Sequence, residues 1–169
     1  MRTNRIATIL IGVGATLGVV PGAAAGDYMV VSANICLPES SHWAEFAGFD
    51  QYGVYADGNT DVTQLWCAMP NTATVNVDPT SFSATVYDRS PTEAVRCDLF
   101  RLNHNGDLSW SQTRTTDGPG WSWPATTFNW SVPSNGGYGY VYAFHCFLPR
   151  YHGLGGGYSW LTSFSSTRP

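Results

Sequence analysis

Two tryptophans spaced for a binding surface are the residues most open to a chemical interpretation. Trp121 and Trp123 stand two positions apart, directly after a segment rich in glycine and proline. In an extended chain both indole rings therefore point the same way, and together they could hold the flat face of a sugar ring. The same rings could instead cap one end of a hydrophobic core, as large aromatic side chains often do in small all-β domains. Trp121 and Trp123 are the candidate ligand-binding residues, and core capping is the alternative.

Catalytic signatures are missing from the sequence. It contains no G-x-S-x-G, H-E-x-x-H or C-x-x-C motif and no glycine loop of the kind that holds phosphate. A Ser/His/Asp triad would have to be assembled from distant residues, starting from one of the four histidines: His42, His104, His145 and His152. His145 alternates with Phe144 and Cys146, which predicts that it lies on the outer face of a sheet. We therefore expect no catalytic residue and no cofactor.

The segment 57–61 raises the question of a metal. Asp57, Asn59 and Asp61 place oxygen ligands at alternate positions, an arrangement that calcium favours. The calcium-loop pattern then fails, because Val62 stands where its glycine belongs and Ala68 where its glutamate belongs. Asp-Gly and Asn-Thr are also ordinary turn sequences, so the segment favours a hairpin turn and no metal.

Four cysteines indicate a disulfide framework: Cys36, Cys67, Cys97 and Cys146. The nearest two are about 30 residues apart, which argues against a zinc site built from close Cys/His pairs. Four cysteines allow three pairings, and the sequence alone does not choose among them. Cys97 and Cys146 both fall on the apolar face of a strand-like run, so we favour Cys97–Cys146, which leaves Cys36–Cys67.

The first 25 residues read as a secretory signal peptide. Arg2 and Arg5 precede an uncharged apolar run, and Ala23 and Ala25 supply the small residues of a cleavage site. This leader predicts a secreted protein, extracellular or periplasmic, with one domain at 26–169. The chain has 12 acidic residues against 8 basic ones, all arginine, and Arg2 and Arg5 lie in the leader. That balance argues against nucleic acid or, after cleavage, a membrane as partner.

The rest of the chain has the pattern of many short strands. Aromatic residues make up 14% of the full sequence, and the alternating runs are separated by glycine, proline and asparagine. Eight runs are predicted as strands: 28–31, 62–69, 82–87, 94–102, 108–113, 126–132, 138–148 and 158–164. Asn105-Gly106 predicts a hairpin turn between two of them. Residues 36–53 are mixed, with room for a helical turn. The fold class is therefore an all-β, antiparallel, jelly-roll-like sandwich of about eight strands with two disulfides.

Several strand-like runs end in a cysteine followed by a proline. These ends are Cys36-Leu37-Pro38, Cys67-Ala68-Met69-Pro70 and Cys146-Phe147-Leu148-Pro149, and Cys97 precedes the Asn105-Gly106 turn. In these features the chain resembles a family of uncharacterised small secreted bacterial β-sandwich proteins. The resemblance implies the fold and the compartment and brings no catalytic residue with it.

The function that the sequence favours is a non-catalytic binding or surface-interaction module. Its ligand would be a carbohydrate or another surface component, bound at Trp121 and Trp123. A secreted hydrolase with a site assembled from scattered residues is one alternative, and a structural or matrix component is another.

Export can be tested by mass. The secreted protein should begin at or near Gly26, because Ala23 and Ala25 fit the cleavage site. Intact-mass analysis of secreted material checks this. A mass that still includes Arg2 and Arg5 would contradict the leader assignment.

Overall fold

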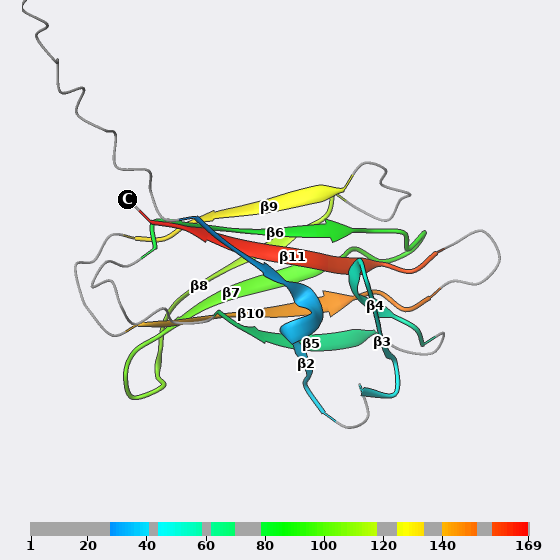
Figure 1. Cartoon of the computed structure of the whole chain (residues 1–169), viewed down its shortest axis with the longest axis horizontal. Coiled ribbons are helices and arrows are strands. Elements are labelled where there is room, and N and C mark those ends of the chain that lie inside the picture. Colours follow the sequence, from blue (N-terminus) through cyan, green and yellow to red (C-terminus); the bar gives the residue numbers. More distant parts are fainter. Residues whose placement is uncertain are drawn as a thin grey trace, which may run out of the picture.

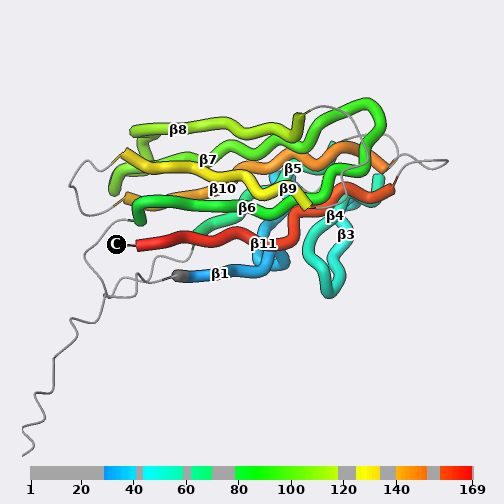
Figure 2. Tube along the Cα trace, turned by 90° about the horizontal axis from the view of Figure 1, so that it is seen from above, coloured from blue at the N-terminus to red at the C-terminus, as the bar shows by residue number. Residues whose placement is uncertain are grey.

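Two antiparallel β-sheets make up the part of the chain described by the computed structural model, residues 28–40, 44–58, 62–69, 79–117, 125–133, 140–151 and 157–168. One sheet contains β1 (Tyr28–Ser32), β3 (Ala47–Asp50), β4 (Gly53–Ala56), β6 (Ser81–Tyr87), β9 (Thr126–Ser131) and β11 (Trp160–Thr167). The other contains β2 (Leu37–Pro38), β5 (Thr63–Ala68), β7 (Arg96–Leu102), β8 (Leu108–Thr115) and β10 (Val141–Leu148). A short 3-10 helix, η1 (Ala33–Ile35), joins β1 to β2 (Figure 1). The two sheets lie face to face (Figure 2).

The order of strands makes β11 and β10 the centres of the two sheets. The five-stranded sheet runs β2-β5-β10-β7-β8, and the six-stranded sheet runs β3-β4-β11-β6-β9. Strand β1 pairs with β11 on the side that β4 also uses, farther along the strand. Because consecutive strands repeatedly change sheets, the fold is a jelly-roll-like sandwich, as the sequence predicted.

Side chains alternate between buried and partly exposed positions along the strands, and the buried set forms the core. In β6 the side chains of Phe82, Ala84 and Val86 are buried, while the residues between them are partly exposed. Large aromatic rings fill the space between the sheets: Phe82, Trp130, Phe144 and Phe164 are all at most 2% exposed. The ring centroids of Trp130 and Phe144 lie 5.2 Å apart, and those of Phe144 and Phe164 lie 5.4 Å apart.

Both disulfides have the pairing that the sequence favoured, Cys97–Cys146 and Cys36–Cys67. Cys97 and Cys146 lie directly opposite each other on β7 and β10, and their bond faces the core. Cys36 bonds to Cys67, which ties the residue before β2 to β5. Each bond therefore joins neighbouring strands of the five-stranded sheet rather than one sheet to the other.

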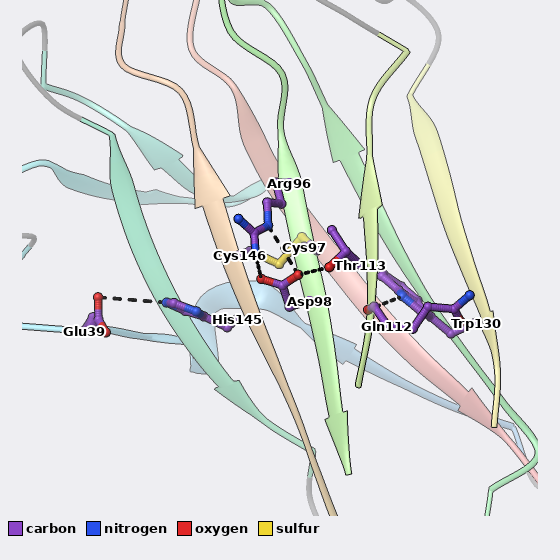
Figure 3. Close-up of polar contacts among 9 residues, drawn as sticks. All are labelled: Glu39, Arg96, Cys97, Asp98, Gln112, Thr113, Trp130, His145 and Cys146. Carbon is purple, nitrogen blue, oxygen red and sulfur yellow. Dashed lines mark hydrogen bonds and ion pairs between the residues drawn. A yellow bond between two sulfur atoms is a disulfide. The ribbon is translucent and has the colours of Figure 1, made fainter. Parts of the chain in front are cut away.

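Side chains close the edge where β8 of one sheet meets β9 of the other. The indole Nε1 of Trp130 donates to the carbonyl oxygen of Gln112 at 3.0 Å (Figure 3). Arg114 Nε donates to the carbonyl oxygen of Asn129, also at 3.0 Å. We call these two bonds the β8–β9 seam.

All eight predicted strands are present, and the described residues contain eleven. The additional three are β2, β3 and β4, which lie in or next to the mixed segment 36–53. The helical turn for which that segment left room is present, since the Ala44 N–H donates to the Ser40 carbonyl oxygen at 3.1 Å. The sequence did not show the hairpin that follows, in which β3 and β4 pair with Ala47 opposite Ala56. The predicted Asn105-Gly106 turn is confirmed, since the Gly106 N–H donates to Asn103 and Gly106 has a φ of 87°. Within the described ranges, the helices are too short and too polar to cross a membrane.

Removing the Cys97–Cys146 bond should weaken the fold substantially. The bond spans 49 residues, and a closed loop of that length is worth about 4 kcal/mol in the chain-entropy model. Urea denaturation of a Cys97→Ala/Cys146→Ala variant measures the cost. A loss below about 1 kcal/mol would contradict the expected contribution.

Candidate functional site

A groove lies on the outer face of the six-stranded sheet. Its volume is about 660 Å³. The described residues that line it are Gln51, Tyr52, Tyr87, Trp160 and Thr162. They come from the β3–β4 turn, the end of β6 and the start of β11, so the hairpin forms a wall beside the sheet. We call this site the aromatic groove.

Strand register places the rings of the groove. Trp160 pairs with Tyr87 on one side and with Tyr55 on the other. The Trp160 and Tyr87 rings are nearly perpendicular, at 83° with centroids 6.5 Å apart. The Tyr55 ring is tilted by 53° against Trp160 at 5.9 Å. Two perpendicular rings on neighbouring strands give the groove an aromatic floor and an aromatic side.

A β-bulge in β11 supplies a polar group. The register of β11 against β6 shifts between Leu161 and Ser163, which leaves Thr162 as the extra residue. Its hydroxyl donates to the carbonyl oxygen of Thr85 at 3.1 Å. The hydroxyl oxygen keeps a free lone pair that can accept a hydrogen bond from a ligand. Bulges often redirect a side chain toward a functional site in this way.

Local hydrogen bonds fix the turn that carries Tyr52. Asp50 Oδ1 accepts from the backbone N–H groups of Tyr52 at 2.7 Å and Gly53 at 3.1 Å. Gly53 has a φ of 137°, and a Cβ there would lie 2.2 Å from the Leu161 carbonyl oxygen. Only glycine therefore allows the hairpin to approach β11 so closely. The side chain of Tyr52 is 65% exposed and stands free for a ligand.

More tyrosines support the Trp160 ring from behind. Tyr158 lies edge-on to Tyr55 at 4.7 Å and stacks on Tyr151 at 4.6 Å. Burial raises the pKa of Tyr158 above its ordinary value, and the nearby Asp57 carboxylate raises it further. The Tyr158 hydroxyl therefore stays protonated at neutral pH. This shell holds Trp160 in place without a charged group in the groove lining.

Sequence patterns alone did not single out these groove residues. The candidates Trp121 and Trp123 lie outside the described residues, so their role stays a prediction. One sequence signal could have pointed to an aromatic outer face: Tyr158 and Trp160 are two residues apart in a predicted strand, and the apolar Leu161 that follows is fully buried. The register with Tyr87 depends on pairing over more than 70 residues, which no local pattern shows.

The outer face of the five-stranded sheet carries a different aromatic arrangement. Trp66 stacks on His145 at 4.3 Å with 6° between the planes, and Phe147 packs on the far side of His145 at 4.5 Å. The Phe100 ring lies 5.5 Å from the Trp66 ring at a tilt of 32°, and the Arg96 guanidinium lies 4.9 Å from the Phe147 ring centre. We call this row the histidine stack. Trp66 contacts the rings of both His145 and Phe100, and the residue is still 38% exposed.

A polar cluster lies beside the histidine stack (Figure 3). Arg96 binds Asp98 through two nitrogens, at 2.8 and 3.3 Å, and Thr113 donates to the same carboxylate at 2.5 Å. Asp98 is only 4% exposed, so these bonds compensate a carboxylate that has lost its water. Asp98 is thus fully engaged in holding the outer face together.

The described residues assemble no catalytic triad around His145. It lies on the outer face, as predicted, but its Nε2 atom is buried without a hydrogen-bond partner in the described part of the chain. The nearest carboxylate oxygen, from Glu39, is 3.9 Å away. His104 is exposed in the β7–β8 turn, while His42 and His152 lie outside the described residues.

No metal centre is formed by the residues that the structure describes. No three His, Cys, Asp or Glu side chains there come close enough to hold an ion. The proposed turn at 57–61 is described only for Asp57 and Gly58, and residues 59–61 lie outside the described ranges.

Comparisons with known proteins find distant structural similarity to carbohydrate-binding modules. The chain is similar to a low-affinity xylan-binding module, CBM86, from Roseburia intestinalis, with 12% identity, a TM-score of 0.49 and coverage of 85% of this chain and 97% of that one. A xylan-binding module, CBM15, is 9% identical with a TM-score of 0.45, covering 84% and 97% of the two chains. A CBM61 module in complex with β-1,4-galactotriose is 11% identical with a TM-score of 0.44, covering 84% and 88%.

The sequence comparisons found no match. No protein-family model matches the chain. No curated protein matches it either. The resemblance to small secreted bacterial proteins is therefore not supported as a family. Because the three TM-scores are below 0.5, the structural similarities assign no function to this chain.

Proposed function

We propose that this chain is an exported, non-catalytic carbohydrate-binding module whose ligand lies in the aromatic groove. The observation that carries this proposal is the combination of three aromatic side chains with two neutral hydrogen-bonding side chains in one open site. Sugar rings have an apolar C–H face and a rim of hydroxyl groups. They therefore need flat apolar surfaces beside short polar groups, and the groove offers both.

Each lining residue has a definite role in this proposal. Trp160 is the floor on which a sugar ring stacks, and Tyr87 is the side that meets the edge of the ring. Tyr52 covers the ligand from the hairpin, and Gln51 and Thr162 exchange hydrogen bonds with hydroxyl groups. The positions of Trp160 and Tyr52 are set before binding by strand pairing and by Asp50, which reduces the entropy lost on binding.

Surroundings on the same sheet are consistent with such a ligand. The outward side chains beyond the groove are short and hydroxylated in β6 and mostly so in β9: Ser81, Ser83, Thr85, Thr127, Asn129 and Ser131. A polysaccharide that extends from the groove along this face would meet hydrogen-bonding groups and no bulky obstacle. In the histidine stack on the other sheet, the Trp66 ring already lies parallel to the His145 ring, and we do not include this row in the proposed site.

A matched pair of tryptophan variants tests the proposal. Trp160→Ala should weaken binding to soluble polysaccharides about tenfold to a hundredfold, the equivalent of about 1.4–2.8 kcal/mol for one lost stacking surface. Trp66→Ala removes the same side chain from the opposite sheet and should leave affinity unchanged. Affinity electrophoresis against a panel of neutral and acidic polysaccharides, followed by calorimetry, measures both.

Further variants separate binding from folding and from the other candidate site. Tyr52→Ala should weaken binding with no change in melting temperature, because its side chain is mostly exposed. Trp121→Ala and Trp123→Ala test the alternative platform. If only these two changes abolish binding, the wild-type protein does bind carbohydrate, but at Trp121 and Trp123 rather than in the aromatic groove. Failure of the wild-type chain to bind any polysaccharide would rule out the function.

A further inference from the structure

We infer that the aromatic groove selects uncharged glycans and rejects those that carry uronic acid or sulfate groups. This inference rests on the proposed function and names the chemical class of its ligand. Its basis is the charge of the groove and of the groups around it.

No formally charged residue lines the groove in the described part of the chain. Two carboxylates are adjacent in sequence to lining residues: Asp88 follows Tyr87, and Asp50 precedes Gln51 and accepts two backbone hydrogen bonds from the turn. Arg89 follows Tyr87 by two residues, but its guanidinium packs against Gly157 and does not line the groove. A bound anion would therefore find a carboxylate close by and no cation in the lining.

Electrostatics then decides the ligand class. An anionic sugar loses water on entering an aromatic site, and this cost is recovered only if a positive group or several hydrogen-bond donors replace the water. The groove offers only neutral donors, and the excess of acidic over basic residues in the chain adds repulsion at low salt. A neutral glycan meets neither penalty.

Matched polymers test this selectivity. Hydroxyethyl cellulose and carboxymethyl cellulose share one backbone and differ in charge, as do arabinoxylan and glucuronoxylan. The neutral member of a pair should bind about tenfold more tightly, equivalent to about 1.4 kcal/mol. Gln51→Arg should raise affinity for the anionic member, while Asn129→Arg, on the same outer face but outside the groove lining, should not.

The outcomes distinguish this inference from the proposed function. Equal or tighter binding of the anionic polymers by the wild type overturns the selectivity but leaves carbohydrate binding in place. The selectivity is also overturned if Gln51→Arg leaves the ratio of affinities unchanged. Binding to no polymer of any charge removes both the selectivity and the function.

The opposite sheet carries an independent feature, and from it we infer that Glu39 and His145 form a proton-operated latch. With a neutral ring, the Glu39 carboxylate stays apart from the imidazole. With a protonated ring, the carboxylate closes in and holds the segment after β2 against the five-stranded sheet.

The geometry of His145 supports the latch. The ring lies between Trp66 and Phe147, its side chain is 11% exposed, and its Nε2 is 3.9 Å from Glu39 Oε2. That distance is too long for a hydrogen bond but close enough for an ion pair once the ring is charged. Glu39 is 39% exposed and its backbone N–H is bound to Gln64, so its side chain can move while its main chain stays fixed.

The charged groups that face the ring come from two parts of the described chain. Glu39 comes from the segment after β2, and Asp98 and Arg96 come from β7. The outward residues of β5 and β10 beside the ring are Gln64, Trp66 and Phe147, none of which ionises. Burial lowers the pKa of His145 below 6.5, Glu39 and Asp98 raise it in part, and Arg96 lowers it.

The lowered pKa of His145 determines how its contribution to the stability of the fold changes with pH. The unfolded chain takes up the proton at about pH 6.5, whereas the folded chain takes it up at a lower pH. The contribution of His145 to stability is thus complete above pH 6.5. It is lost as the pH falls from there to the folded pKa. Glu39 reduces this loss, because its charge favours the protonated ring.

Nuclear magnetic resonance titration of the histidine ring protons tests the latch, with His145 assigned by a His145→Gln variant. The wild-type midpoint should lie below 6.5, and Glu39→Gln should move it lower still. Glu45→Gln removes an equal charge from an exposed residue that does not act on His145, and should leave the midpoint unchanged. A Glu39→Gln midpoint that stays constant or rises would overturn the latch.

Discussion

The bulge in β11 is the constraint on which the proposed site depends. Before it, β11 pairs with β4, and after it, with β1, while β6 stays paired along the other side. This exchange of partners leaves room for the β3–β4 hairpin to stand beside the sheet as a wall. It also gives Thr162 a position outside the normal register. Without the extra residue, the strict two-residue period of a strand would turn Phe164, which lies three residues after the buried Leu161, out of the core.

The two outer faces show how differently one strand pattern can use aromatic side chains. On the six-stranded sheet, Trp160 and Tyr87 meet at nearly a right angle, so their rings do not stack on each other. On the five-stranded sheet, Trp66 and His145 are almost parallel and cover each other. The angle between neighbouring rings, rather than the number of aromatic residues, therefore distinguishes the face that carries the proposed site from the opposite one.

Much of the fold was predictable because its signals are local. Alternation found eight of the strands, and the apolar phase of Cys97 and Cys146 favoured the correct disulfides. The β3–β4 hairpin was missed because its strands have only four residues each and its turn relies on Asp50 and Gly53, which are not a standard turn pair. The groove was missed because it depends on long-range register. Tyr87 and Trp160 become neighbours only when β6 and β11 pair, whereas the two-residue spacing of Trp121 and Trp123 can be read directly from the sequence.

The β8–β9 seam has a consequence for how these molecules behave at high concentration. Edge strands normally present free backbone groups to which a strand from another molecule can be added. Here the Trp130 indole and the Arg114 guanidinium already occupy the carbonyl oxygens of Gln112 and Asn129. A foreign strand would have to displace a core tryptophan from its hydrogen bond before it could pair there. We therefore expect the seam to hinder the addition of a foreign strand at this side of the sandwich.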